Sequence, residues 1–255
     1  MQKAPEREVV GHGAETVVFV PALGTTREMW APQVTYFAPD FRVVSFDAGG
    51  HDPSQSMGRT LADFADELRR LLVSTGAARP HIVGISMGGM IAQVFAIRYP
   101  SMPASIVLVN TTPFYPPEAR QQIELRAQTA EHDGMSSLVE PTLERWFTAR
   151  FRETEPETVD RIRGMLRTAD PHAYAEAARA VAAIDTRSRL DQIQCPTLII
   201  RAEKDASMPA TAAQTLHEQV RLSRLAVFSG AAHLCSVEQP DQFNEVVSQF
   251  VGSLA

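Results

Sequence analysis

The sequence predicts an α/β protein with a mostly parallel, doubly wound sheet that carries an inserted helical lid. Short apolar runs alternate with helical patterns from residue 17 to residue 110, which is typical of strands joined by right-handed helical crossovers. From residue 114 to about residue 190, apolar residues recur at helical spacing only, and an apolar strand pattern resumes at residues 196–200. We therefore expect the sheet to be interrupted and then completed by the C-terminal part of the chain.

The interruption defines the expected domain organisation. Residues 1–112 and 191–255 are predicted to form one core, and residues 113–190 a helical cap inserted between two of its strands. An insertion of that size at the ends of strands is most simply a lid over a site. A chain of 255 residues, of which 44% are hydrophobic, is long enough to bury one sizeable core.

Each core element is predicted from an apolar run or from helix start and stop signals. Strands are expected at residues 17–20, 41–46, 105–109, 196–200 and 223–228 and in the run that ends just before Ser86. Thr60 is a predicted N-cap, and Gly76 is the predicted end of the helix that follows it. Further helices are expected from Ser86 to about Tyr99, over about 210–220 and over about 239–251, with four or so short ones in the cap.

Composition and charge exclude several classes of function. The net charge is −6 and there is no basic run, which argues against nucleic acid or an anionic membrane as partner. The chain shows no signal-peptide stretch and no apolar segment long enough to span a bilayer, and its two cysteines, Cys195 and Cys235, form no disulfide framework. We expect reduced thiols in a cytoplasmic protein. No nucleotide motif and no metal-ligand spacing is present, so we expect no cofactor and no metal.

The motif Gly84-Ile85-Ser86-Met87-Gly88 is the strongest signal for chemistry. A strand, a tight G-x-S-x-G turn and a helix in succession are typical of a nucleophilic serine whose hydroxyl stands above the sheet edge. Glycines flank the serine because a Cβ there would collide with the crossing strand and helix. The alternative interpretation of Ser86 is an ordinary N-cap serine that opens a helix.

Two further residues make a catalytic triad with Ser86. Asp205 lies beyond the strand at 196–200, and His233 lies beyond the strand at 223–228, so all three side chains are expected at one edge of the sheet. The chain order Ser, Asp, His is that of α/β-hydrolases. His233 is predicted to act as the base and Asp205 to orient it. Asn110 cannot replace the acid because it holds no charge, and Glu203 is interpreted as solvated or capping.

The predicted oxyanion hole consists of two backbone N–H groups. Met87 opens the helix after Ser86, so its N–H has no partner within that helix. We expect a second donor in the N–H of Leu23, in the loop after the strand at 17–20. Each such donor stabilises a tetrahedral intermediate by about 3 kcal/mol. Among the other histidines His51 is the best candidate for a site role. Its loop, which begins at Asp47, is interpreted as a structural turn that supports the loop of Ser86.

With these motifs the chain resembles the α/β-hydrolase superfamily, and more narrowly the 3-oxoadipate enol-lactonase family. The resemblance covers nearly the whole length. The segments that carry it are Leu23-Gly24-Thr25, Met29-Trp30, Gly84 to Gly89, Thr142-Leu143-Glu144-Arg145-Trp146-Phe147, Met165-Leu166, Asp170-Pro171 and Ala232-His233-Leu234. The sequence departs from the family after the second strand, where the usual arginine is missing from Asp47-Ala48-Gly49-Gly50-His51, and at residues 110–117, which add aromatic residues and prolines.

The resemblance implies an α/β-hydrolase fold and hydrolysis of a lactone ring in the breakdown of aromatic compounds. Ser86 would open the ring to an acyl-enzyme, which water activated by His233 would release. Such a substrate bears a carboxylate, for which Arg145, Arg150 and Arg152 in the cap are candidate partners. Trp146 and Gly24 are further candidates for substrate contact.

Three other functions stay open at this stage. One is a broad carboxylesterase, the second a related hydrolase that cleaves a carbon–carbon bond in a ring-fission product. The third is a receptor-like protein that keeps the pocket and the triad but turns over slowly. The departures from the family at residues 47–53 and 110–117 both border the predicted pocket, so the scaffold is expected to carry over better than the substrate.

Overall fold

The computed structural model describes residues 7–48 and 58–254. The predictions for His51 and its glycines, and for the first six residues, lie outside the described residues. A seven-stranded sheet has the order β1-β3-β2-β4-β5-β6-β7. The strands are β1 (Arg7–Val10), β2 (Thr16–Val20), β3 (Arg42–Phe46), β4 (His81–Ile85), β5 (Ser105–Val109), β6 (Thr197–Ala202) and β7 (Ser223–Phe228). All neighbouring pairs are parallel except β1 and β3.

The edge strand β1 was missing from the sequence prediction. Its four residues are exposed or half-buried, so they form no apolar run. By contrast, every residue of β2, β4 and β5 is buried, as expected for strands covered on both faces. The predicted mostly parallel, doubly wound sheet is confirmed.

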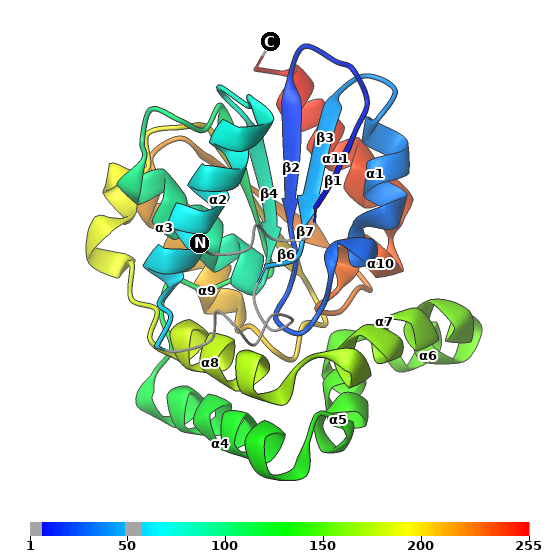
Figure 1. Ribbon diagram of the computed structural model, residues 1–255. Helices are drawn as coiled ribbons and strands as arrows, with labels where there is room; N and C mark the ends of the chain where they lie inside the picture. The colour runs from blue at the N-terminus through cyan, green and yellow to red at the C-terminus, as the bar shows by residue number, and fades with distance from the viewer. Residues whose placement is uncertain (1–6, 49–57, 255) are drawn as a thin grey trace.

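Helices cover both faces of the sheet (Figure 1). One face carries α2 (Leu61–Thr75), α3 (Met87–Arg98), α9 (Ala210–Gln219) and the 3₁₀ helix η3 (Arg187–Gln192); the other carries η1 (Arg27–Trp30), α1 (Ala31–Phe37), α10 (Cys235–Glu238) and α11 (Pro240–Gly252). A hydrophobic cluster lies on each face of the sheet, and alternate residues of β2 point into the two clusters. Val18 packs on the side of α2 and α3, and Phe19 packs with Trp30 and Phe37 on the other side.

The helix signals in the core were confirmed at residue level. Thr60 caps α2 in a capping box, in which its side chain accepts from the N–H of Asp63 and the Asp63 carboxylate accepts from the N–H of Thr60. Gly76 ends the helix in the left-handed region, at φ +72°. The helix α3 begins at Met87, directly after Ser86.

The segment between β5 and β6 is helical. It contains α4 (Pro117–Asp133), α5 (Ser136–Trp146), α6 (Ala149–Thr154), α7 (Pro156–Thr168) and α8 (Pro171–Ala182), one helix more than the four or so expected. These helices lie together at one end of the sheet (Figure 1). Phe114 and Asp185 form an isolated antiparallel bridge where the chain enters and leaves this segment. We keep the name cap for residues 113–190.

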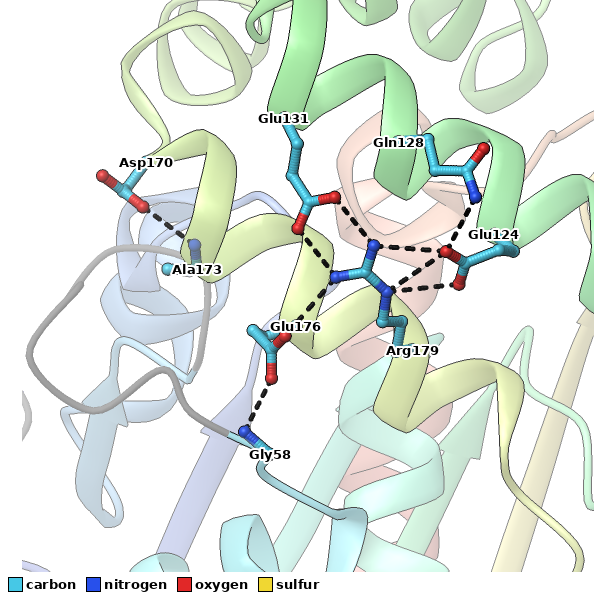
Figure 2. Close-up of polar contacts among 8 residues, drawn as sticks. All are labelled: Gly58, Glu124, Gln128, Glu131, Asp170, Ala173, Glu176 and Arg179. Atoms are coloured by element: carbon cyan, nitrogen blue, oxygen red, sulfur yellow. Dashed lines mark hydrogen bonds and ion pairs between the residues drawn. The ribbon is translucent and has the colours of Figure 1, made fainter.

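One arginine joins three carboxylates within the cap (Figure 2). Arg179 of α8 donates to Glu124 and Glu131 of α4 and to Glu176 of its own helix. This pairing raises the pKa of Arg179 and lowers that of Glu131. Glu176 also accepts from the N–H of Gly58, at 2.7 Å. We call these four side chains the α4–α8 clamp.

No helix within residues 7–48 and 58–254 is long and apolar enough to cross a membrane.

Candidate active site

Ser86 sits on a strained turn between β4 and α3. Its backbone has φ +55° and ψ −116°, a conformation that non-glycine residues rarely adopt. The turn is held by the N–H of Ser86, which donates to the Val109 carbonyl at 2.9 Å, and by its carbonyl, which accepts from the Thr111 hydroxyl at 2.8 Å. The Ser86 side chain makes no capping hydrogen bond to α3. The alternative interpretation as an N-cap serine is therefore not supported.

The glycines of the motif are required by close approach. A Cβ on Gly84 would lie 2.2 Å from the Gly88 carbonyl oxygen, and a Cβ on Gly88 would lie 2.2 Å from the Val20 carbonyl oxygen. Both contacts are with backbone, which cannot move aside without displacing β2 or α3. Only glycine at these two positions allows β4, β2 and α3 to converge beneath Ser86.

His233 and Asp205 are joined by a buried hydrogen bond. His233 Nδ1 lies 2.8 Å from Asp205 Oδ2, and the two side chains are 1% and 2% exposed. The other carboxylate oxygen, Oδ1, accepts from the N–H groups of Ser207 and Met208, at 2.7 and 3.2 Å. An ionised carboxylate can only accept, so this contact fits a His233 tautomer that carries its proton on Nδ1.

Asn110 has a structural role that the sequence did not indicate. Its Nδ2 donates to the His233 carbonyl at 2.7 Å, and its Oδ1 accepts from the N–H of Ala202 at 2.7 Å. Its backbone is left-handed, at φ +41°. Asn110 therefore ties the end of β5 to the end of β6 and to the loop that carries His233. Glu203, the other rejected acid, is exposed and accepts from the N–H of Gly230 at 3.1 Å.

A cavity of about 250 Å³ lies between the core and the cap, with Ser86 and His233 in its wall. The core contributes Leu23, Ser86, Met87 and His233 to its wall. Within the part of the chain that the structure describes, no hydrogen bond joins Ser86 Oγ to His233. Such contacts are often long in an unliganded enzyme and tighten when substrate binds.

The predicted oxyanion donors border this cavity. Leu23 occupies a tight turn closed by the N–H of Thr25, which donates to the Ala22 carbonyl at 3.1 Å. Gly24 takes the left-handed position of that turn, at φ +78°. Met87 is the first residue of α3, so its N–H is free of the helical ladder.

The predicted substrate contacts fall into two groups. Arg145 and Trp146 line the cavity, and the Trp146 ring lies 5.9 Å from the His233 ring, centroid to centroid. Arg150 and Arg152 line a different pocket, beside Lys204, and Arg145 borders that pocket as well. Gly24 is not part of the cavity wall; a Cβ on it would lie 3.1 to 3.2 Å from Leu166 and Tyr174.

Arg126 of α4 also lines the cavity, and sequence reasoning missed it. A signal was present: Ala119, Gln122, Ile123 and Arg126 are spaced i, i+3, i+4 and i+7, and all four line the cavity. That spacing puts them on one face of a helix. Few residues of this face are apolar, so the spacing of apolar residues along the sequence did not reveal that the face lines a cavity.

The cavity is positively charged. Burial lowers the pKa of Arg145, and the nearby positive charge of Arg126 lowers it further. Burial raises the pKa of Tyr174, so its hydroxyl stays protonated, although both arginines oppose that shift. The wall contains no aspartate or glutamate among the described residues. The described residues also contain no group of three or more histidine, cysteine, aspartate or glutamate side chains that could hold a metal ion.

Comparison with known proteins identifies the family. Residues 15–240 match the family model described as alpha/beta hydrolase fold, and the chain belongs to that family. The chain is 31% identical to 3-oxoadipate enol-lactonase 1 of Acinetobacter baylyi over 94% of this chain and 90% of the relative. The resemblance to enol-lactonases noted in the sequence is thereby confirmed, and the protein is a hydrolase of the α/β-hydrolase family.

Two solved structures have the same fold over almost their full length. The enol-lactonase from Burkholderia xenovorans LB400 superposes with a TM-score of 0.91 at 28% identity, covering 97% of this chain and 96% of that chain. A thermophilic esterase from Thermogutta terrifontis, solved with malate bound, gives a TM-score of 0.91 at 27% identity, covering 98% of this chain and 93% of that chain.

Proposed function

We propose that the protein is a serine hydrolase that opens a small lactone or ester through an acyl-enzyme. One observation carries the proposal: Ser86, on its strained turn, faces the same cavity as His233, whose Nδ1 is held by Asp205 at 2.8 Å. A serine hydroxyl is a weak nucleophile at neutral pH and needs an adjacent base. His233 can supply that base, because its ring is held at Nδ1 and the residue lines the same cavity as Ser86.

The first half of the reaction acylates the enzyme. His233 Nε2 takes the proton of Ser86 as Oγ attacks the carbonyl carbon of the substrate. The carbonyl oxygen becomes an oxyanion, which the N–H groups of Met87 and Leu23 stabilise. The tetrahedral intermediate then collapses, the carbon–oxygen bond to the leaving oxygen breaks, and the imidazolium donates its proton to that oxygen. When the leaving oxygen is an enol, it becomes a ketone without help from the protein.

The second half releases the product. His233 removes a proton from a water molecule, which attacks the acyl carbon and forms a second oxyanion in the same hole. The bond to Ser86 Oγ breaks, and the imidazolium returns a proton to the serine. The product is the free acid. Asp205 keeps the imidazole in one tautomer and stabilises its positive form in both halves.

A small substrate is supported by the cavity. Its volume of about 250 Å³ is below the usual range of pockets for drug-sized ligands, which is about 300–1,000 Å³. A lactone is favoured by the similarity to the enol-lactonases, at 31% and 28% identity. A carboxylesterase is the second candidate, because the esterase from T. terrifontis superposes equally well, with a TM-score of 0.91.

Burst kinetics test the mechanism. With p-nitrophenyl acetate we expect an initial burst of nitrophenol from the acyl-enzyme, and Ser86→Ala should lose the burst and at least about 10⁴-fold in kcat. Ser137→Ala, which changes an exposed serine on α5, is the matched control and should keep the wild-type burst. Hydrolysis undiminished in Ser86→Ala would rule the mechanism out.

A second substrate separates lactonase from esterase. An enol-lactone and the nitrophenyl ester are assayed side by side with the same enzyme. We expect the lactone to give the higher kcat/KM, with both activities lost in Ser86→Ala. Cleavage of the simple ester alone would replace the lactonase proposal with the esterase one.

A further inference from the structure

Two guanidinium groups converge on the cavity from different cap helices. Arg126 comes from α4 and Arg145 from α5, and both line the cavity with Ser86. Arg145 donates to the Thr142 hydroxyl at 3.1 Å. Neither arginine forms an ion pair with a residue in the described ranges 7–48 and 58–254. Arginines elsewhere in the cap differ in this respect, since Arg163 and Arg179 bind carboxylates of neighbouring helices.

Burial and the charge of Arg126 both disfavour the positive charge of Arg145. Removing a guanidinium from water without a partner costs free energy, and burial is the largest cause of the lowered pKa of Arg145. The charge of Arg126 adds repulsion to that cost. The carboxylate of Glu144, the exposed residue before Arg145, offsets part of this cost. The carboxylate of Asp205 accepts from His233, Ser207 and Met208. It is thus already bound on both oxygens.

We propose that Arg126 and Arg145 form one anion subsite that takes the two carboxylates of a doubly charged substrate, a dicarboxylate that also carries the lactone or ester group. This specificity rests on the proposed function, because the scissile carbonyl must reach Ser86. A single carboxylate would neutralise one guanidinium and leave the other unpaired. Two carboxylates neutralise both, and arginine binds each through paired N–H donors.

The tyrosines of the cavity suit the same ligand. Tyr174 lies within the electrostatic reach of both arginines and lines the cavity with them. Burial keeps its hydroxyl protonated, so it can donate a hydrogen bond to a carboxylate oxygen. The subsite therefore combines two guanidinium groups with the neutral hydroxyl of the buried Tyr174. Hydrogen bonds made away from bulk water are stronger than those in water.

Calorimetry on Ser86→Ala protein tests the subsite without turnover. The ligands are succinate, glutarate and adipate, each paired with the monocarboxylate of equal chain length: butyrate, valerate and hexanoate. At pH 7.5 and fixed ionic strength, we expect the best dicarboxylate to bind at least about tenfold more tightly than its partner, or about 1.4 kcal/mol. Arg126→Gln and Arg145→Gln should each bring its affinity close to that of the monocarboxylate.

Arg167→Gln is the matched control, because Arg167 is an exposed arginine on α7 outside the cavity wall. It should keep the tenfold preference. Equal binding of dicarboxylate and monocarboxylate, within about threefold, overturns the proposal. A preference that persists in both Arg126→Gln and Arg145→Gln overturns it too. Wild-type protein, which binds these inert ligands without reaction, serves if Ser86→Ala does not fold.

Kinetics on charged substrates complete the test. Nitrophenyl esters whose acyl chains carry none, one or two free carboxylates are compared by kcat/KM. We expect a gain of about tenfold from the second carboxylate, and no gain from it would contradict the proposal. Failure here differs from failure of the proposed function: a burst with the neutral ester shows that the serine chemistry stands even if the charge preference is absent.

Discussion

The catalytic edge of the core and the cap are positioned by different kinds of contact. At the edge, the backbone sets the geometry: Gly84 and Gly88 permit strand and helix to touch, and Asn110 bonds two backbone groups of neighbouring loops. In the cap, side chains set the geometry: α4 and α8 contribute buried residues, such as Ile123 and Ala178, to one hydrophobic cluster. Arg179 also joins the two helices through carboxylates that are 24% and 40% exposed.

Under the proposed function, the edge would perform the chemistry and the cap would select the substrate, so the two tasks would depend on different kinds of contact. At Gly84 and Gly88 a Cβ would lie 2.2 Å from a backbone oxygen, so no other residue fits at these positions. The backbone around Ser86 is therefore held in one arrangement. Partly exposed ion pairs are weak and can be exchanged at little cost in stability.

The largest expected effect comes from removing the charge behind the histidine. Asp205→Asn should lower kcat by about 10⁴ with the fold retained, because the amide favours the wrong tautomer of the imidazole. Glu203→Gln, two residues earlier and exposed, is the control and should change kcat little. Both variants are compared by kcat and by thermal unfolding. A tenfold loss or less in Asp205→Asn would place the acid elsewhere.

A pair of glycine substitutions compares the two regions directly. Gly88→Ala puts a methyl group against the Val20 carbonyl, so we expect at least about a hundredfold loss of kcat/KM and about 1–3 kcal/mol of destabilisation from overpacking. Gly164→Ala, in α7 of the cap, meets no atom within 4 Å and should stabilise the protein by about 0.5–1 kcal/mol. Chemical denaturation measures both. Equal changes in unfolding free energy for Gly88→Ala and Gly164→Ala would contradict the proposed difference between the core edge and the cap.

Asn110 tests whether a neutral side chain positions the histidine loop. Asn110→Ala leaves the N–H of Ala202 and the carbonyl of His233 without their partners, at about 1–3 kcal/mol for each buried group. Asn110→Asp keeps the acceptor for Ala202 and tolerates the left-handed backbone, but it sets a buried carboxylate oxygen against the His233 carbonyl, which now accepts from Asn110 Nδ2. Its loss of stability should therefore be at least as large as that of alanine. Urea unfolding and kcat are measured for both. Full stability in Asn110→Ala would show that the bridge is dispensable.

Most of the catalytic edge could be predicted because the sequence encodes it locally. The apolar runs and the G-x-S-x-G turn predict where parallel strands end, and parallel strands end at one edge of the sheet. Asp205 and His233 meet for that reason alone, 28 residues apart in sequence. The strand β1 escaped prediction because its exposed residues have no apolar run to mark it.

The wall of the cavity could be predicted only in part, because it depends on how the cap helices turn about their axes. Arg145 and Trp146 were found through the family resemblance, whereas Arg126 has no motif. Its helix is polar on most faces, so the pattern of charges does not distinguish the arginine that lines the cavity from those that face solvent. Tertiary contacts, including the α4–α8 clamp, decide which face turns inward.

The smallest expected effect tests the clamp itself. Arg179→Met removes the ion pairs between α4 and α8, and because Arg179 is 33% exposed we expect a loss of no more than about 1 kcal/mol in unfolding free energy. Without these ion pairs α4 should be held less firmly, and so should Arg126.

We therefore expect KM for a carboxylate-bearing ester to rise about threefold to fivefold in Arg179→Met while kcat for p-nitrophenyl acetate stays near wild type. Arg98→Met removes a similarly exposed ion pair between Arg98 and Asp66 on the core surface and should leave both KM values unchanged. If Arg98→Met and Arg179→Met raised KM equally, the α4–α8 clamp would have no specific part in holding the cavity wall. The idea that side-chain contacts position the cap would then be contradicted.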